Sequence, residues 1–279
     1  MTTPDTPLRF DIEVEIAGTP EQVWQAIATA EGISSWFLPT DLDGREGGAI
    51  VTHMGDTSSP GRVTGWDPPR RFVYEEPEWA AMVGHPEADV TPLTNEFLVE
   101  ARSGGTCVVR VTSSAFGTGA DWEHEFLDDM ATYYEPFFDF LRLYVERFPG
   151  QRATRREVDI RFPGEPGAVI PAAARSLGVA APGDVVPADA GLGVGGTVMR
   201  VADPYLMVDV DGPVPGYVHV LATQADEGVA SAQVSAWLFG PGAEEVADAA
   251  AAGWRPWLDS LGLAAGTAAA GTAGDGGAR

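Results

Sequence analysis

Residues 9–32 read RFDIEVEIAGTPEQVWQAIATAEG, and this stretch decides the fold. Apolar and charged residues alternate through its first eight positions, which is typical of an antiparallel strand with one buried face. Thr19 can cap a helix that follows at once, because Pro20 suits the first helical position and Gln22 stands three residues after the cap. Apolar residues then recur at helical spacing as far as Gly32, where we expect the helix to end.

Beyond this stretch the chain alternates short strand patterns with Gly, Pro and Asp turns. Strands are predicted over residues 49–54, 62–66, 70–75, 93–102 and 106–114. Residues 76–92 contain three prolines and are predicted to form a long loop. One long helix is predicted over residues 120–148, with Thr118 as its cap and a kink at Pro136.

The second half of the chain repeats the first in the same order and in shortened form. Four of the matching pairs are residues 156–162 with the opening strand, 163–178 with the first helix, 203–204 with 67–68, and 254–261 with 134–141. We therefore predict one domain over residues 1–148, a linker over 149–154 and a second domain over 155–262. Residues 263–279 are almost entirely Ala, Gly and Thr, so we expect a disordered tail.

The charge composition excludes several functions. The chain of 279 residues has 17 basic and 41 acidic residues and a net charge of −24, and all of its basic residues are arginine. Without lysine there can be no Schiff-base lysine and no phosphate-binding loop that ends in lysine. Such an acidic protein is not expected to bind nucleic acid or an anionic membrane. A single cysteine, Cys107, and the lack of a signal-peptide pattern predict a cytoplasmic protein without disulfides.

Four short motifs carry a resemblance to a known family. They are Thr19-Pro-Glu-Gln-Val-Trp24, Trp36-Phe37-Leu38-Pro39, Gly47-Gly48 and Gly65-Trp-Asp-Pro-Pro-Arg-Arg-Phe-Val-Tyr74. They resemble the bacterial branch of the activator-of-heat-shock-protein-90-ATPase homologue family, which belongs to the START-like (SRPBCC) superfamily. The resemblance implies an α+β helix-grip fold, in which a curved antiparallel sheet wraps around a long C-terminal helix, here in two tandem copies. It also implies an apolar cavity between sheet and helix, where most members bind small hydrophobic ligands and a minority catalyse reactions.

Aromatic and apolar side chains that should face this cavity are the candidate binding residues, and pure core packing is the alternative for each of them. The candidates are Trp36, Phe37, Tyr74, Phe97, Val111, Trp122, Phe126, Met130, Tyr133 and Phe137. No residues are predicted to be catalytic, no cofactor is implied, and the four histidines lack the spacing of a metal site. The acidic pairs Glu75-Glu76 and Asp128-Asp129 are interpreted as solvated charge.

We predict a cytoplasmic protein that binds a small hydrophobic molecule, with sequestration of a natural product as one use of that binding. One alternative is a cyclase-like or hydratase-like enzyme with a cavity Tyr, His or Glu as acid or base. Another is a chaperone-regulating interaction module with a role in the stress response. An ionisable group beside a polar partner in the cavity would favour the enzyme, and a closed, packed cavity would favour the module. The short seam between the halves also predicts that the two domains pack on each other within the chain.

Overall fold

A computed structural model describes residues 5–55 and 57–263, and two compact units divide the chain after Arg152. Each unit is described by itself. The first unit has one antiparallel sheet with strand order β1-β7-β6-β5-β4-β3-β2. Its strands are β1 (Thr6–Ala17), β2 (Thr40–Leu42), β3 (Ala49–Met54), β4 (Thr57–Asp67), β5 (Arg71–Glu76), β6 (Leu93–Ala101) and β7 (Thr106–Gly117). Its helices are α1 (Pro20–Ile27), α2 (Ala30–Ser34), α3 (Trp79–Met82) and α4 (Asp121–Arg147).

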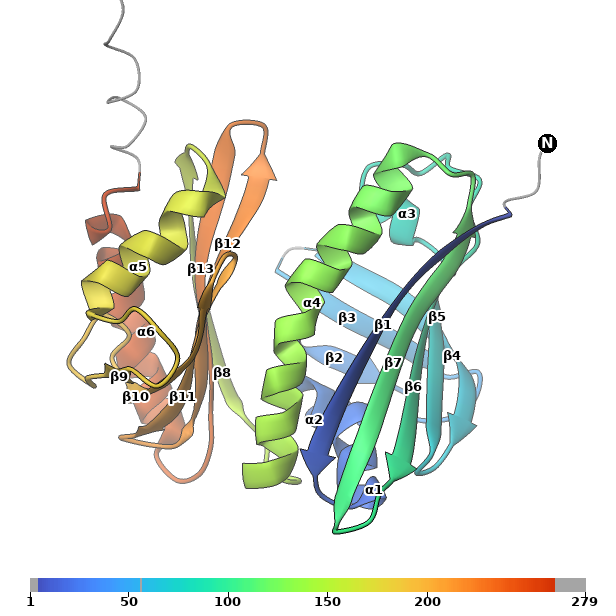
Figure 1. Ribbon diagram of the computed structural model, residues 1–279, viewed down its shortest axis with the longest axis horizontal. Helices are drawn as coiled ribbons and strands as arrows, with labels where there is room; N and C mark the ends of the chain where they lie inside the picture. Colours follow the sequence, from blue (N-terminus) through green and yellow to red (C-terminus); the bar gives the residue numbers. More distant parts are fainter. Residues whose placement is uncertain (1–4, 56, 264–279) are drawn as a thin grey trace, which may run out of the picture. The chain divides into compact units, whose positions relative to one another are not determined.

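The long helix α4 lies along β1 and runs across one face of this sheet (Figure 1). Helix α1 contacts both α4 and β6, and together with α2 it follows β1 at one end of the sheet. A curved antiparallel sheet around a long C-terminal helix is the predicted helix-grip architecture, and the prediction is confirmed.

The strand and helix predicted from residues 9–32 are present, although the helix is shorter than predicted. The hydroxyl of Thr19 accepts from the Gln22 backbone N–H at 3.3 Å, and the Gln22 side chain accepts from the Thr19 N–H at 2.9 Å. Helix α1 ends at Ile27, because Thr29 caps a second helix by accepting from the Gly32 N–H at 3.0 Å. Gly32 thus lies inside α2 and does not end α1, and a Cβ there would lie 1.9 Å from the Gln25 carbonyl oxygen.

Two local predictions around α4 are corrected. The segment predicted as a loop contains the short helix α3. The cap of α4 is not Thr118 with Asp121, because the carboxylate of Glu123 accepts from the backbone N–H groups of Thr118, Gly119 and Ala120. A carboxylate folded back onto three free N–H groups satisfies the helix start better than one hydroxyl can. The helix itself continues through Pro136.

The second unit repeats this plan with fewer strands and a shorter final helix. Its sheet order is β8-β13-β12-β11-β10-β9, all antiparallel. The strands are β8 (Thr154–Pro163), β9 (Val185–Val186), β10 (Gly195–Ala202), β11 (Tyr205–Gly212), β12 (Gly216–Asp226) and β13 (Val229–Leu238). A 3₁₀ turn, η1 (Pro166–Ala168), leads into α5 (Val169–Leu177), and α6 (Ala243–Ser260) ends the described fold; both helices lie on one face of the sheet (Figure 1). The predicted tail lies outside the described residues, apart from Leu263.

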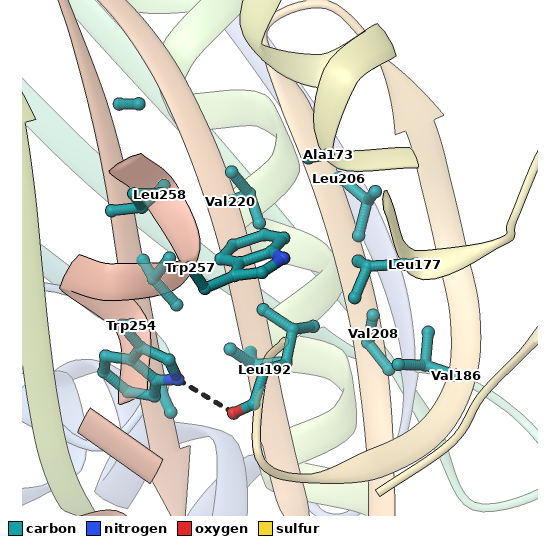
Figure 2. Packing of buried hydrophobic residues seen from close by; sticks show 14 of the residues in the cluster. Ala173, Leu177, Val186, Leu192, Leu206, Val208, Val220, Trp254, Trp257 and Leu258 are labelled. Atoms are coloured by element: carbon teal, nitrogen blue, oxygen red, sulfur yellow. Dashed lines mark hydrogen bonds between the residues drawn. The ribbon is translucent and has the colours of Figure 1, made fainter. Parts of the chain in front are cut away.

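Tryptophans fill the space between sheet and helices in this second unit. Trp254 of α6 is fully buried, and its indole N–H donates to the Leu192 carbonyl at 2.8 Å (Figure 2). Trp257 belongs to the same buried apolar cluster, and a Cβ on Gly191 would lie 2.0 Å from its indole ring. Gly191 and Gly193 therefore allow their loop to approach α6 closely.

Candidate functional site

A cavity lies between the sheet and α4 in the first unit. It contains about 800 Å³ of space between atoms, part of it open to solvent, and a water molecule's centre can occupy about 90 Å³ of that. The part that water can occupy has room for several water molecules, since one molecule needs about 10–15 Å³ by this measure. Eight aromatic side chains line it: Phe10, Trp36, Phe37, Phe72, Tyr74, Phe97, Tyr134 and Phe138.

On the sheet side of the cavity, strand alternation decides which side chains form the wall. On β5, Phe72, Tyr74 and Glu76 point into the cavity, while Val73 and Glu75 occupy the alternate positions. Antiparallel register continues the wall across the sheet. Tyr74 stands opposite Asn95 on β6, Phe97 stands opposite Val111 on β7, and Asn95 stands opposite Ser113.

Helix α4 closes the other side with side chains one turn apart. Met130, Tyr134 and Phe138 line the cavity, and they follow one another at intervals of four residues. The sequence analysis selected Tyr133 from this part of the helix, but a stripe with a 3.6-residue period passes between Tyr133 and Tyr134. Tyr134 is the one that continues the line from Met130 to Phe138.

The structure places six of the ten predicted binding residues on the cavity wall, namely Trp36, Phe37, Tyr74, Phe97, Val111 and Met130. The other four lie off this wall: Trp122, Phe126, Tyr133 and Phe137. Trp122 and Phe126 pack on Trp79 of α3, with ring centroids 5.5 and 4.7 Å apart. Phe137 packs edge-on against Phe37 at 4.9 Å. Ligand contact by any of them stays a prediction.

A polar network inside this apolar wall was missed by the sequence analysis. The Ser59 hydroxyl donates to one carboxylate oxygen of Glu76, and the Asn95 side-chain amide donates to the other at 2.7 Å. The Ser113 hydroxyl in turn donates to the Asn95 carbonyl oxygen at 2.6 Å. Ser59, Asn95 and Ser113 are all buried, so each hydrogen bond lies away from bulk water.

Glu76 is therefore corrected from solvated charge to a cavity residue. Its adjacency to Glu75 suggested an exposed acidic pair, but period-two alternation with Phe72 and Tyr74 was a signal that it faces inward. Burial raises the pKa of the Glu76 carboxyl, and the hydrogen bonds from Ser59 and Asn95 only partly oppose this rise. Burial, and then the negative charge of Glu76, also raises the phenol pKa of Tyr134.

Other charged residues lie away from the cavity. Arg110 pairs with Glu13 at 2.7 Å and with Glu100 at 2.9 Å, and it does not line the cavity. Asp128 and Asp129 are exposed on α4, as interpreted. Over residues 5–55 and 57–263, no three His, Cys, Asp or Glu side chains are grouped so that they could hold a metal ion. Within the same ranges, no helix is long and apolar enough to cross a membrane.

The opening of the cavity is marked by α3. Met82 at the end of this helix lines the cavity and is also 42% exposed, and its neighbour Val83 is 41% exposed. An exposed apolar side chain that also lines the cavity indicates a route for an apolar molecule from solvent.

Comparison with known proteins identifies the family of the first unit. Residues 17–146 match the profile of the Activator of Hsp90 ATPase homolog 1-like protein family. No curated protein sequence matches the chain significantly.

Solved structures with a similar fold include the Aha1 dimer from Colwellia psychrerythraea, at 19% identity over 51% of this chain and 99% of that one, with a TM-score of 0.42. CalU16 from Micromonospora echinospora is 18% identical over 50% and 75% of the two chains, with a TM-score of 0.39. The di-domain ARO/CYC BexL from the BE-7585A biosynthetic pathway is 16% identical over 94% and 95%, with a TM-score of 0.42.

The motifs, the helix-grip fold and the family profile agree. Over residues 17–146, the first unit is similar to the Activator of Hsp90 ATPase homolog 1-like family, as the sequence motifs implied.

Proposed function

We propose that the first unit binds a small, mainly apolar molecule between its sheet and α4. The observation that carries this proposal is the cavity itself, which has room for several water molecules and has eight aromatic side chains in its wall. Burial of apolar ligand surface against such walls contributes roughly 25 cal/mol per Å². Sequestration of a hydrophobic natural product is one use that this binding would serve.

The two units differ in whether the space between the sheet and the last helix is open or filled. The internal repeat aligns Tyr134 of α4 with Trp254 of α6. Tyr134 lines an open cavity, whereas the larger Trp254 is fully buried and hydrogen-bonded within its own core. We therefore assign ligand binding to the first unit.

The neutral fluorophore N-phenyl-1-naphthylamine tests binding, because its emission rises in an apolar environment. We expect saturable binding with little dependence on salt, since screening acts on charges and not on apolar burial. Phe97→Ala removes a wall side chain and should change the affinity by roughly 1–3 kcal/mol. Phe116→Ala is the matched control, because it deletes the same atoms from a ring on β7 that is exposed and lies off the cavity wall. Absence of saturable binding to the wild-type protein would refute the proposal.

Proton transfer by Glu76 is a second candidate function. A carboxyl with a raised pKa in an apolar cavity, beside polar partners, is the feature that distinguishes the enzyme alternative. 5-Nitrobenzisoxazole is a suitable probe, because its ring opens when a base removes the proton on C3. Ring opening should be faster with wild-type protein than with Glu76→Gln, and Glu75→Gln should behave as wild type. Equal rates for all three proteins would exclude Glu76 as the base.

A closed and packed cavity would favour the chaperone-regulating alternative. The first unit instead has an open cavity, which supports the binding proposal over that alternative.

A further inference from the structure

The cavity contains a carboxylate site without a matching positive charge. Its lining residues, all among those the structure describes, include one acidic side chain, Glu76, and no Arg or His. No positively charged group contributes to the pKa of Glu76, which depends on burial and on two neutral hydrogen-bond donors. A negative charge at this position is therefore hydrogen-bonded but has no counter-ion among the described residues that line the cavity.

The hydrogen bonds point in one direction, toward Glu76. The Ser113 hydroxyl donates to the Asn95 carbonyl oxygen, which turns the Asn95 amide group toward the carboxylate. With the Ser59 hydroxyl on the other oxygen, both Glu76 oxygens act as acceptors. Two buried donors oriented in this way suit the ionised carboxylate better than the neutral acid, which must donate from one oxygen.

The walls around this carboxylate are aromatic. Tyr74 and Phe72 precede Glu76 on the same face of β5, and Phe97 stands opposite Phe72 on β6. Tyr134 on α4 is close enough for the charge of Glu76 to raise its pKa. Aromatic ring faces attract cations, and more strongly in a site that is withdrawn from water.

From these observations, and resting on the proposed function, we infer that the cavity selects a hydrophobic cation, a lipophilic amine or quaternary ammonium whose charge lies against Glu76. The cation would supply the missing counter-charge while its apolar body fills the aromatic cavity. A neutral molecule would leave the carboxylate uncompensated, and an anion would be repelled by it.

Three probes with the same chain length test this selectivity: octyltrimethylammonium, octanol and octanoate, each below its micelle concentration. Displacement of N-phenyl-1-naphthylamine from the full-length protein reports occupancy of the cavity. We expect the cation to bind at least tenfold more tightly than octanol, and octanoate to bind most weakly, where tenfold corresponds to about 1.4 kcal/mol.

Glu76→Gln should abolish the preference for the cation and leave the affinity for octanol within about threefold, a difference of less than 1 kcal/mol. Glu75→Gln is the matched control, since it changes the net charge equally at the neighbouring position outside the cavity. Any attraction of the cation to the acidic surface at large would be the same in both variants.

The possible failures are distinguishable. Absence of fluorophore binding to wild-type protein would overturn the proposed function and this inference together. Binding of the fluorophore and octanol without a preference for the cation would overturn the inference alone, and this result needs no variant. A preference that survives in Glu76→Gln would overturn the role of Glu76.

Discussion

Replacement of Glu76 by glutamine should stabilise the first unit at neutral pH. Glutamine has nearly the same shape, and its carbonyl oxygen can accept from the Asn95 amide where the carboxylate now accepts at 2.7 Å. The hydroxyl of Ser59 can rotate and accept from the new amide group, so both hydrogen bonds can be retained. What changes is the charge, since the variant no longer has to keep an ionised group in an apolar cavity without a counter-ion.

The gain should be on the order of 1–2 kcal/mol, within the range that mutational data give for a buried polar group without full compensation. For a unit of 152 residues this corresponds to an increase in Tm of about 2–8 °C. The raised pKa of Glu76 also determines how the stability of the wild-type protein depends on pH. A carboxyl whose pKa rises on folding binds more protons in the folded state, so wild-type stability falls as the pH rises from the unfolded pKa through the raised one.

Differential scanning calorimetry of full-length wild type and Glu76→Gln at pH 5.0 and pH 8.0 measures this effect. Both values lie above the isoelectric point of about 4.3, so the protein keeps a net charge. The advantage of the variant should be larger at pH 8.0 than at pH 5.0, and Glu75→Gln should stay within about 0.5 kcal/mol of wild type. A variant less stable than wild type at pH 8.0, or an advantage equal at both values, would refute the reasoning.

Three further predictions concern other parts of the chain. Glu123→Gln should lower the free energy of unfolding by about 1–3 kcal/mol at pH 7, and the exposed Glu125→Gln is its control. Burial of Glu123 is outweighed by its hydrogen bonds, which lower the pKa of its carboxyl, so its contribution to stability must shrink as the pH falls through that lowered pKa. A loss of stability that does not depend on pH in thermal scans would contradict this. Trp257→Ala should lower the free energy of unfolding by about 3–5 kcal/mol. Gly191→Ala should also destabilise the wild-type protein, but it should have almost no further effect in a protein that already contains Trp257→Ala. Additive losses of stability in urea titrations would argue against the close approach of Gly191 to Trp257. The packing of the two domains on each other stays a prediction, and a cooperative thermal transition in isolated residues 155–262 would count against it.

Regular local patterns were sufficient to predict most of the fold. The strand over residues 9–16, the Thr19 capping box and the long helix near 120–148 follow from interactions within a few residues, and the structure contains all three. The break between α1 and α2 was not predicted, because the apolar spacing continues across it and the second cap at Thr29 was not recognised. The Glu123 cap was missed because a carboxylate that bonds three N–H groups at once is a property of the folded turn.

By itself, the sequence determined the architecture of this protein and its duplication, because hydrophobic periodicity, turn residues and the internal repeat are visible along the chain. It also determined that any binding site must work without lysine. The tertiary structure alone decided which side chains meet. Ser59, Glu76, Asn95 and Ser113 lie on four different strands, and the antiparallel register of the sheet brings them into one network. The register also decided that Glu76 faces the cavity and Glu75 does not, since a shift of one residue would exchange the two faces.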